Sequence, residues 1–178
     1  MTGSTAPGGP PDFLEFAAAR GRQLYKTAYL LTGGDAHLAE DLVQEALSRM
    51  FVRWRRVSRL ENPAGYAQTV LVNTFISLRR RRSSSERVTG EFPELAVTDG
   101  DPALRVTLLD ALRRMSRQDR AVLVLRFWED RSVEETAAAL QLTSTAVRSR
   151  SHRALGRMRA QLGGSVTEFA DRPEHRSR

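Results

Sequence analysis

Toward its C-terminus the chain contains SVEETAAALQ (Ser132–Gln141), then LT (Leu142–Thr143), then STAVRSRSHRALGRMRAQL (Ser144–Leu162). The first segment predicts a short helix that begins at a capping box, because Ser132 is followed three residues later by Glu135. The last segment predicts a longer helix, and the two residues between them form a tight connection. A short helix, a tight turn and a second helix make up the helix-turn-helix pattern.

The longer of these two helices has two sides of different chemistry. At about 100° per residue, its apolar stripe consists of Val147, Ser151, Ala154, Leu155, Met158 and Leu162. The opposite side consists of Thr145, Arg148, Ser149, His152 and Arg153, flanked by Arg150 and Arg157. No acidic residue lies between Ser144 and Ala160, and arginine can donate two hydrogen bonds to guanine or meet phosphates. We therefore expect these seven residues to contact DNA; the alternative is an ordinary solvated helix face.

Residues 13–57 are predicted to form two helices, because apolar residues recur at three- and four-residue steps. Gly33-Gly34 is expected to end the first, since helices often finish at glycine. Asp35 is expected to cap the second, which reaches about Val57. One polar flank of this second helix carries Asp41, Gln44, Glu45 and Ser48. On geometry alone, acids that offset the helix dipole near its N-terminus explain this flank best.

A third helix is predicted to begin at Asn62-Pro63, typical N-cap and first-turn residues, and to run into Arg79–Arg82. One of its flanks carries Tyr66, Thr69, Asn73 and Arg80, with Arg79 at the same basic end. An aromatic ring, an amide and a basic end suit an unstacked base and its phosphates, so this flank is a candidate nucleic-acid site. A charged helix end favoured by the dipole is the alternative for the arginines.

Between the two helical regions, residues 83–103 lose this periodicity and collect Ser, Gly, Pro and acidic residues, which predicts a flexible linker. No strand-like alternation is found. The fold class is therefore predicted to be all-α, with two small helical bundles joined by the linker and the helix-turn-helix in the second. The predicted segments are a disordered start (1–12), a first bundle (13–82), the acidic linker (83–103), a second bundle (104–162) and a polar tail (163–178).

The charge of the 178-residue chain is unevenly placed. It carries 28 Lys and Arg against 21 Asp and Glu, a net charge of +7. Each predicted bundle carries +6 and the linker carries −4. Only Lys26 among the basic residues is lysine. Arginine suits phosphate and base contacts, which favours nucleic acid as a partner, while a codon bias is an equally good explanation of the surplus as a whole.

Several classes of protein are excluded by what the sequence lacks. It has no cysteine, and therefore no disulfide framework and no thiolate metal site. No run approaches the roughly 20 apolar residues of a membrane helix, and Met1–Pro11 has no signal-peptide pattern, so we expect a cytoplasmic protein without membrane insertion. With no Gly-rich phosphate loop, no HExxH and three histidines far apart, we expect no enzyme, no catalytic or metal-binding residue and no cofactor.

Three stretches of the chain resemble the sigma-70 family of transcription initiation factors. AEDLVQEAL (Ala39–Leu47) resembles their core-polymerase-binding segment, and NPAGYAQTVLVNTFISLRRRR (Asn62–Arg82) is similar to their promoter-melting segment. Residues Met115–Arg159 resemble their promoter-reading domain. Having only these two domains, with a short acidic tether, resembles an extracytoplasmic-function (ECF, group IV) sigma factor. TAYLLTG (Thr27–Gly33) and RWRRV (Arg53–Val57) are most similar to the SigE-like subgroup.

This resemblance implies a role for each candidate surface. The positions that dock on the clamp helices of the largest polymerase subunit are matched by Asp41, Gln44 and Glu45. A flipped base of the −10 element would be captured at Asn73, beside the loop of residues 58–62. The −35 element would be read by Arg148, Ser149, His152 and Arg153. The implied partners are core RNA polymerase, including its flap for the C-terminal domain, and promoter DNA; whether an anti-sigma factor also binds stays open.

The implied function is that of a dissociable sigma factor, which binds core RNA polymerase and directs promoter-specific initiation by −35 recognition and by −10 recognition and melting. The alternative is a stand-alone dimeric helix-turn-helix regulator, which would footprint a palindrome without polymerase. Three residues depart from the family pattern: Leu47 replaces an aromatic residue, Ser151 stands where a larger apolar residue is expected, and Gln141 stands where the turn often has glycine. We expect that turn to differ or to hold some strain.

Overall fold

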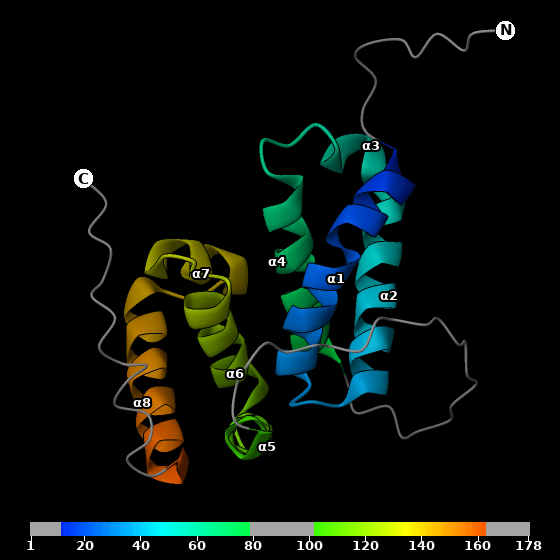
Figure 1. The fold of residues 1–178 in the computed structure, drawn as a ribbon. Coiled ribbons are helices and arrows are strands. Elements are labelled where there is room, and N and C mark those ends of the chain that lie inside the picture. The colour runs from blue at the N-terminus through cyan, green and yellow to red at the C-terminus, as the bar shows by residue number, and fades with distance from the viewer. Residues whose placement is uncertain (1–11, 79–101, 163–178) are drawn as a thin grey trace, which may run out of the picture.

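The computed structural model describes residues 12–78 and 102–162, and within these ranges every regular element is a helix (Figure 1). The all-α prediction is confirmed. Arg79 and Arg80, the predicted linker apart from its last two residues, and the predicted tail lie outside the described residues.

The N-terminal bundle, residues 13–78, begins its helices where the sequence indicated. Asp35 and Asn62 are N-caps as predicted: the Asp35 carboxylate accepts from Leu38 N at 3.0 Å and the Asn62 amide oxygen from Gly65 N at 2.8 Å. Its helices are α1 (Phe13–Leu31), α2 (Ala36–Val52), α3 (Trp54–Val57) and α4 (Pro63–Ser77).

Two boundaries in the N-terminal bundle were predicted wrongly. Asp12 is not part of a disordered start, because its carboxylate accepts a hydrogen bond from Leu14 N at 3.3 Å and caps α1. The second helix does not continue to Val57, because the backbone leaves the helical conformation at Arg53. The break lets Trp54 pack against Phe13 and Phe16, with ring centroids 5.3 and 4.9 Å apart, an arrangement that favours aromatic pairs.

Two further boundaries, on either side of the predicted linker, also differ from prediction. The third predicted helix does not run into Arg79–Arg82: α4 ends at Ser77, because Leu78 has an extended ψ of 99° and packs against the core. The fifth helix begins at Pro102 rather than Leu104, since proline is well tolerated in a first helical turn.

The C-terminal bundle, residues 102–162, contains the predicted helix-turn-helix. Ser132 and Glu135 form the predicted reciprocal capping box, and Ser116 caps α6, since its Oγ accepts from Asp119 N at 3.1 Å. A short π-helix continues α6, so that Glu129 N donates to Val124 O at 3.0 Å. The elements are α5 (Pro102–Arg113), α6 (Arg117–Leu123), η1 (Val124–Trp128), α7 (Val133–Leu140) and α8 (Ser144–Leu162).

The two bundles pack against each other, with α6 and α7 beside α4 and with α5, α6 and η1 reaching α1 (Figure 1). One cluster of buried apolar side chains is continuous across the boundary, from Leu71 and Phe75 of α4 to Val122, Leu125 and Ala139. A second cluster lies between α5, α6 and α8. We call this arrangement, with the two bundles in contact, the closed state. Burial of the shared apolar surface stabilises it relative to separated bundles.

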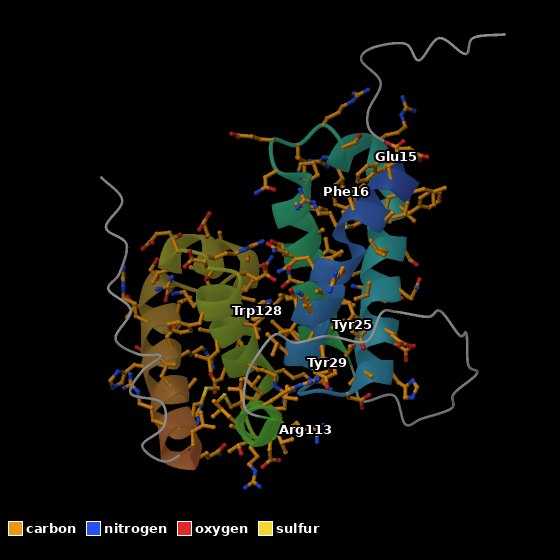
Figure 2. All side chains as sticks on the ribbon, viewed as in Figure 1. Glu15, Phe16, Tyr25, Tyr29, Arg113 and Trp128 are labelled. Carbon is orange, nitrogen blue, oxygen red and sulfur yellow. The ribbon has the colours of Figure 1, made fainter. Side chains whose placement is uncertain are left out.

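The C-terminal end of α1 is the polar part of this contact. Gly33 has φ +70°, as the predicted helix end requires, and a Cβ there would collide with the Arg113 side chain. Arg113 Nε donates to Gly33 O at 2.5 Å (Figure 2). Arg120 donates to Leu31 O at 2.6 Å and lies over the Phe75 ring at 5.5 Å. Two guanidinium groups therefore satisfy carbonyls at the negative end of α1.

The expected strain in the helix-turn-helix is present at Gln141. Its φ of 54° and ψ of 43° place it in the left-handed region, where it ends α7. Leu142 N then donates to Ala137 O at 2.9 Å, as in a glycine-terminated helix. A side chain in this conformation costs about 1 kcal/mol, which glycine does not incur.

We predict that Gln141→Gly raises the free energy of unfolding by about 0.5–1 kcal/mol, because the relief of left-handed strain exceeds the added entropy of the unfolded chain. Urea denaturation followed by circular dichroism measures this. Gln141→Ala is the matched control, since it also removes the side chain but keeps a Cβ. A gain of equal size in both variants would contradict the strain assignment.

Candidate polymerase and nucleic-acid interfaces

The outward side of α8 is organised as the sequence predicted. Val147, Ala154 and Met158 are buried against the bundle, while Ser151 places an unpartnered hydroxyl among them. The residues exposed on the other side are Thr145, Arg148, Ser149, His152 and Arg153. The structure thus brings five of the seven predicted DNA contacts onto one exposed surface of a helix, the arrangement that the major groove accepts.

Arg148 is held only weakly within the protein. Its guanidinium contacts Glu134 of α7 at 3.1 Å, and both side chains are more than half exposed. Exposed ion pairs of this kind contribute little to stability, and salt screens them. Arg148 can therefore exchange Glu134 for a phosphate or a base without a large cost.

Arg150 and Arg157 are placed differently from the other five predicted residues. Both contact Asp119 of α6, at 2.8 and 2.7 Å, and the Asp119 side chain is only 13% exposed. Burial acts to raise the pKa of Asp119, but hydrogen bonds from Arg150 and Ser116 and the charges of both arginines outweigh it, so that the pKa lies below its usual value. The pair fixes α8 on α6; a DNA contact by either arginine stays a prediction.

The flank of α4 is partly covered in this structure: Tyr66 and Thr69 are half-buried, whereas Asn73 is exposed. Thr69 Oγ accepts a hydrogen bond from Arg131 at 3.0 Å, and Asn73 Nδ2 donates to Ala139 O at 3.1 Å. Tyr66 is partly buried and packs against the shared core. The three predicted residues do lie along one side of α4, but the C-terminal bundle contacts two of them. The other two, Arg79 and Arg80, lie outside the described residues.

The flank of α2 is exposed, and α2 itself lies on the side of the N-terminal bundle away from the C-terminal bundle (Figure 1). Asp41, Gln44 and Glu45 are all exposed, over a buried stripe that includes Leu42 and Ala46. Glu45 pairs with Arg49 at 2.8 Å, one turn further along, and both side chains are half exposed. The flank therefore presents two carboxylates and an amide that a basic partner surface can reach.

Sequence reasoning missed the residues that join the two bundles. The carboxylate of Glu129 accepts hydrogen bonds from Thr27 of α1 and Gln68 of α4. Arg131 donates to Gly65 O at 2.7 Å and to Gln68 Oε1 at 2.8 Å. Their only sequence signal is a charged turn, Glu129-Asp130-Arg131, between the apolar run ending at Trp128 and the capping box. Nothing local shows what such a turn contacts.

Each of the two bundles matches a known protein family. The sigma-70 region 2 family model matches residues 16–85, and the sigma-70 region 4 model matches residues 105–158. The RNA polymerase sigma-E factor of Streptomyces coelicolor is 37% identical over 153 residues, which cover 85% of this chain and 86% of that protein. The ECF RNA polymerase sigma factor SigE of Mycolicibacterium smegmatis is 31% identical over 171 residues, 90% of this chain and 65% of that protein.

The fold has a counterpart among solved structures. A co-crystal structure of the sigma factor RpoE in complex with the anti-sigma factor NepR from Bartonella quintana matches with a TM-score of 0.65. The match covers 85% of this chain and 96% of that chain at 24% identity. At this level of identity the likeness supports the fold.

A helix-turn-helix bundle with an exposed basic helix, joined to a second helical bundle that matches sigma-70 region 2, defines a promoter-directing transcription initiation factor. The chain belongs to the sigma-70 family, and within it to the ECF RNA polymerase sigma factors. Its function is to direct promoter-specific transcription initiation with core RNA polymerase. In the residues that the structure describes, no helix is long and apolar enough to cross a membrane.

We predict that Asp119→Asn lowers the free energy of unfolding by about 1–2 kcal/mol at pH 7, because the partly buried carboxylate holds two arginines of α8. Since the folded pKa of Asp119 is depressed, its contribution is present above its ordinary value of 3.8 and is lost as the pH falls below it. The difference from wild type should therefore shrink between pH 4 and the lowered pKa in urea denaturation.

The control for this prediction is Asp110→Asn, which removes an exposed ion pair to Arg114 with side chains 50% and 66% exposed. We expect it to change stability by less than about 0.5 kcal/mol. Equal effects of the two substitutions at every pH would show that Asp119 does not anchor α8.

Proposed function

We propose that this sigma factor divides its work among three surfaces: α8 reads the −35 element, the flank of α4 receives the −10 element, and the flank of α2 docks on polymerase. The observation that carries the proposal is the exposed, acid-free side of α8 above a buried apolar seam. No covalent step is assigned to the chain itself, so its contribution is binding free energy that the polymerase uses.

The −35 surface is proposed to enter the major groove of duplex DNA. Arg148 and Arg153 are exposed at the two edges of the outward side of α8, about 140° apart around the helix, with His152 and Ser149 between them. Arginine can form paired hydrogen bonds with guanine, while the smaller polar residues complete the contact. Thr145 lies in the first turn of α8, where a phosphate also meets the positive end of the helix dipole.

The −10 surface is proposed to lie on α4, with Asn73 as the residue that captures an unstacked base and with Tyr66, Thr69, Arg79 and Arg80 along the same path. An amide can form hydrogen bonds with the edge of a flipped base, and basic residues suit the phosphates beside it.

The chain as a whole is proposed to consist of three functional segments. Residues 13–82 make the polymerase and −10 contacts, residues 83–103 are a linker, and residues 104–162 make the −35 contacts.

The docking surface is proposed to be Asp41, Gln44 and Glu45 against the clamp helices of the largest polymerase subunit, with the C-terminal bundle on the flap. The exposure of all three side chains supports this.

An anti-sigma factor is proposed as a further partner, because the solved sigma factor with this fold is bound to one. The stand-alone dimeric regulator has no support among the relatives described above.

The experiment that tests this function is reconstitution with core RNA polymerase and sequencing of transcript starts from genomic template. We expect a limited set of starts, each preceded by two unlike elements at a fixed spacing. Protection of a palindrome by the chain without polymerase would instead favour the dimeric regulator.

We predict that Arg153→Ala weakens −35 recognition by about 1–3 kcal/mol and relaxes the preference at one base position. Run-off transcription from promoters with single changes in the −35 element measures this. Arg114→Ala is the control, because it removes the same charge from an exposed position just after α5. Equal selectivity of the two variants would remove Arg153 from the −35 surface.

We predict that Asp41→Arg weakens binding to core polymerase by about tenfold or more, since a repulsive charge replaces an attractive one at the interface. The variant should remain folded, because Asp41 is exposed and makes no buried contact. Glu15→Arg is the matched control: it makes the same charge change at an exposed position near the start of α1 (Figure 2). Undiminished co-purification of Asp41→Arg with polymerase would contradict the docking assignment.

A further inference from the structure

The turn of residues 129–131, between η1 and α7, is seated on the N-terminal bundle. Its Glu129 carboxylate accepts from Thr27 and Gln68, and also from Gln23 Nε2 at 3.4 Å. Its Arg131 guanidinium donates to Thr69, to Gly65 O and to Gln68. These two side chains of opposite charge thus bind one polar strip formed by α1 and the first half of α4.

The C-terminal bundle holds this turn in a fixed conformation. Asp130 has φ 51°, an uncommon value for a residue with a side chain. Arg131 N donates to Leu125 O at 3.0 Å, and Arg131 O accepts from Arg126. The capping box of α7 begins at the next residue, Ser132. Because the turn is tied to η1 and α7, it moves with the C-terminal bundle as a unit.

The strip that the turn binds overlaps the proposed −10 surface. The Thr69 hydroxyl accepts from Arg131 at 3.0 Å, and one turn along α4 the Asn73 amide donates to Ala139 O at 3.1 Å. Ala139 O is one of the carbonyls at the C-terminal end of α7 that have no partner within the helix. A base that is captured at Asn73 needs the same amide, so the base and the C-terminal bundle exclude each other.

We propose that the Glu129–Arg131 turn and the C-terminal end of α7 are an intramolecular cover for the −10 surface, which the free sigma factor keeps closed. This inference rests on the −10 assignment made above. In the closed chain α8 and the flank of α2 stay exposed, while on α4 Thr69 is half-buried and the amide of the exposed Asn73 is already bonded to the C-terminal bundle. The chain can therefore meet polymerase in the closed state, but it presents the −10 surface only after the bundles separate.

The chemistry of the contact suits a cover that opens. The direct partners of the turn are hydroxyls, amides and one backbone carbonyl, which water or phosphates can replace on separation. Arg131 is half-buried, and burial lowers its pKa, so opening returns its charge to solvent. A ligand that binds only the open state has its apparent affinity reduced by the fraction of open molecules. Weakening the cover should therefore raise the affinity of the free chain for −10 DNA.

The test compares the free full-length chain with its Glu129→Ala/Arg131→Ala variant. The probe is a fluorescent single-stranded oligonucleotide that carries the non-template −10 element of a promoter mapped by transcript-start sequencing. Asp110→Ala/Arg114→Ala is the matched control, because it also removes one acid and one arginine, from an exposed ion pair. A cooperative thermal transition shows that each variant is folded. Should the double variant fail to fold, Glu129→Gln, which keeps the size of the side chain, takes its place.

We expect the double variant to bind the oligonucleotide about fivefold or more tightly than wild type, although its net charge is unchanged. Asp110→Ala/Arg114→Ala should bind as wild type does. The gain should disappear when Asn73→Ala is added, because the uncovered surface is then defective. No gain in the folded double variant, or a gain that survives Asn73→Ala, overturns the proposal.

The −10 assignment itself is tested separately in the holoenzyme, where the bundles are expected to be apart. Asn73→Ala should spare closed-complex formation and impair promoter opening, as measured by permanganate reactivity of the −10 thymines. Wild-type opening by this variant refutes the −10 surface. Impaired opening together with no gain in the free double variant refutes only the cover.

Discussion

The arrangement of the whole molecule depends on one buried guanidinium, that of Arg120. It is 8% exposed and donates to Leu31 O of α1 and to Arg113 O and Met115 O at the end of α5, while its plane lies near Phe75 of α4. Burial and the charges of Arg117 and Arg113 lower its pKa to about 10, so it remains charged at neutral pH. A buried charge without an acidic partner must be solvated by carbonyls. The end of α1 therefore has to lie against α6, and this contact brings the Glu129–Arg131 turn onto α4.

The three proposed surfaces differ in how the fold presents them. The flank of α2 and the outer side of α8 are exposed whichever way the bundles are arranged, because each lies over the buried stripe of its own bundle. The side of α4 instead lies at the boundary, where Phe75 and Leu71 belong to the apolar core that both bundles share. A protein that must melt DNA only when polymerase is present gains from this difference. Under the proposal made above, its docking surface is available first, and its melting surface is available after separation.

Local chemistry explains which features could be predicted from sequence. The caps at Asp35, Asn62 and Ser132 depend on residues within three positions of each other, and the two sides of α8 follow from the helical repeat alone. Contacts between residues that are far apart in the sequence follow no local pattern, so they could not be predicted. Asp119 of α6 holds Arg150 and Arg157, which are 31 and 38 residues away. The role of Arg120 was hidden for the same reason, since its acceptors are backbone carbonyls, which every residue has.

The central claim about this molecule is that the closed chain is the free state, and that promoter recognition requires the bundles to separate on polymerase. Because the chain has no cysteine, cysteines placed at the exposed positions Arg22 of α1 and Ala138 of α7 can be labelled with spin probes. We expect a short, narrow distribution of distances between the two spin labels in the free chain. Once core polymerase and promoter DNA are added, the distance between the labels should increase. An unchanged distance in a transcribing complex, or a broad distribution in the free chain, would contradict it.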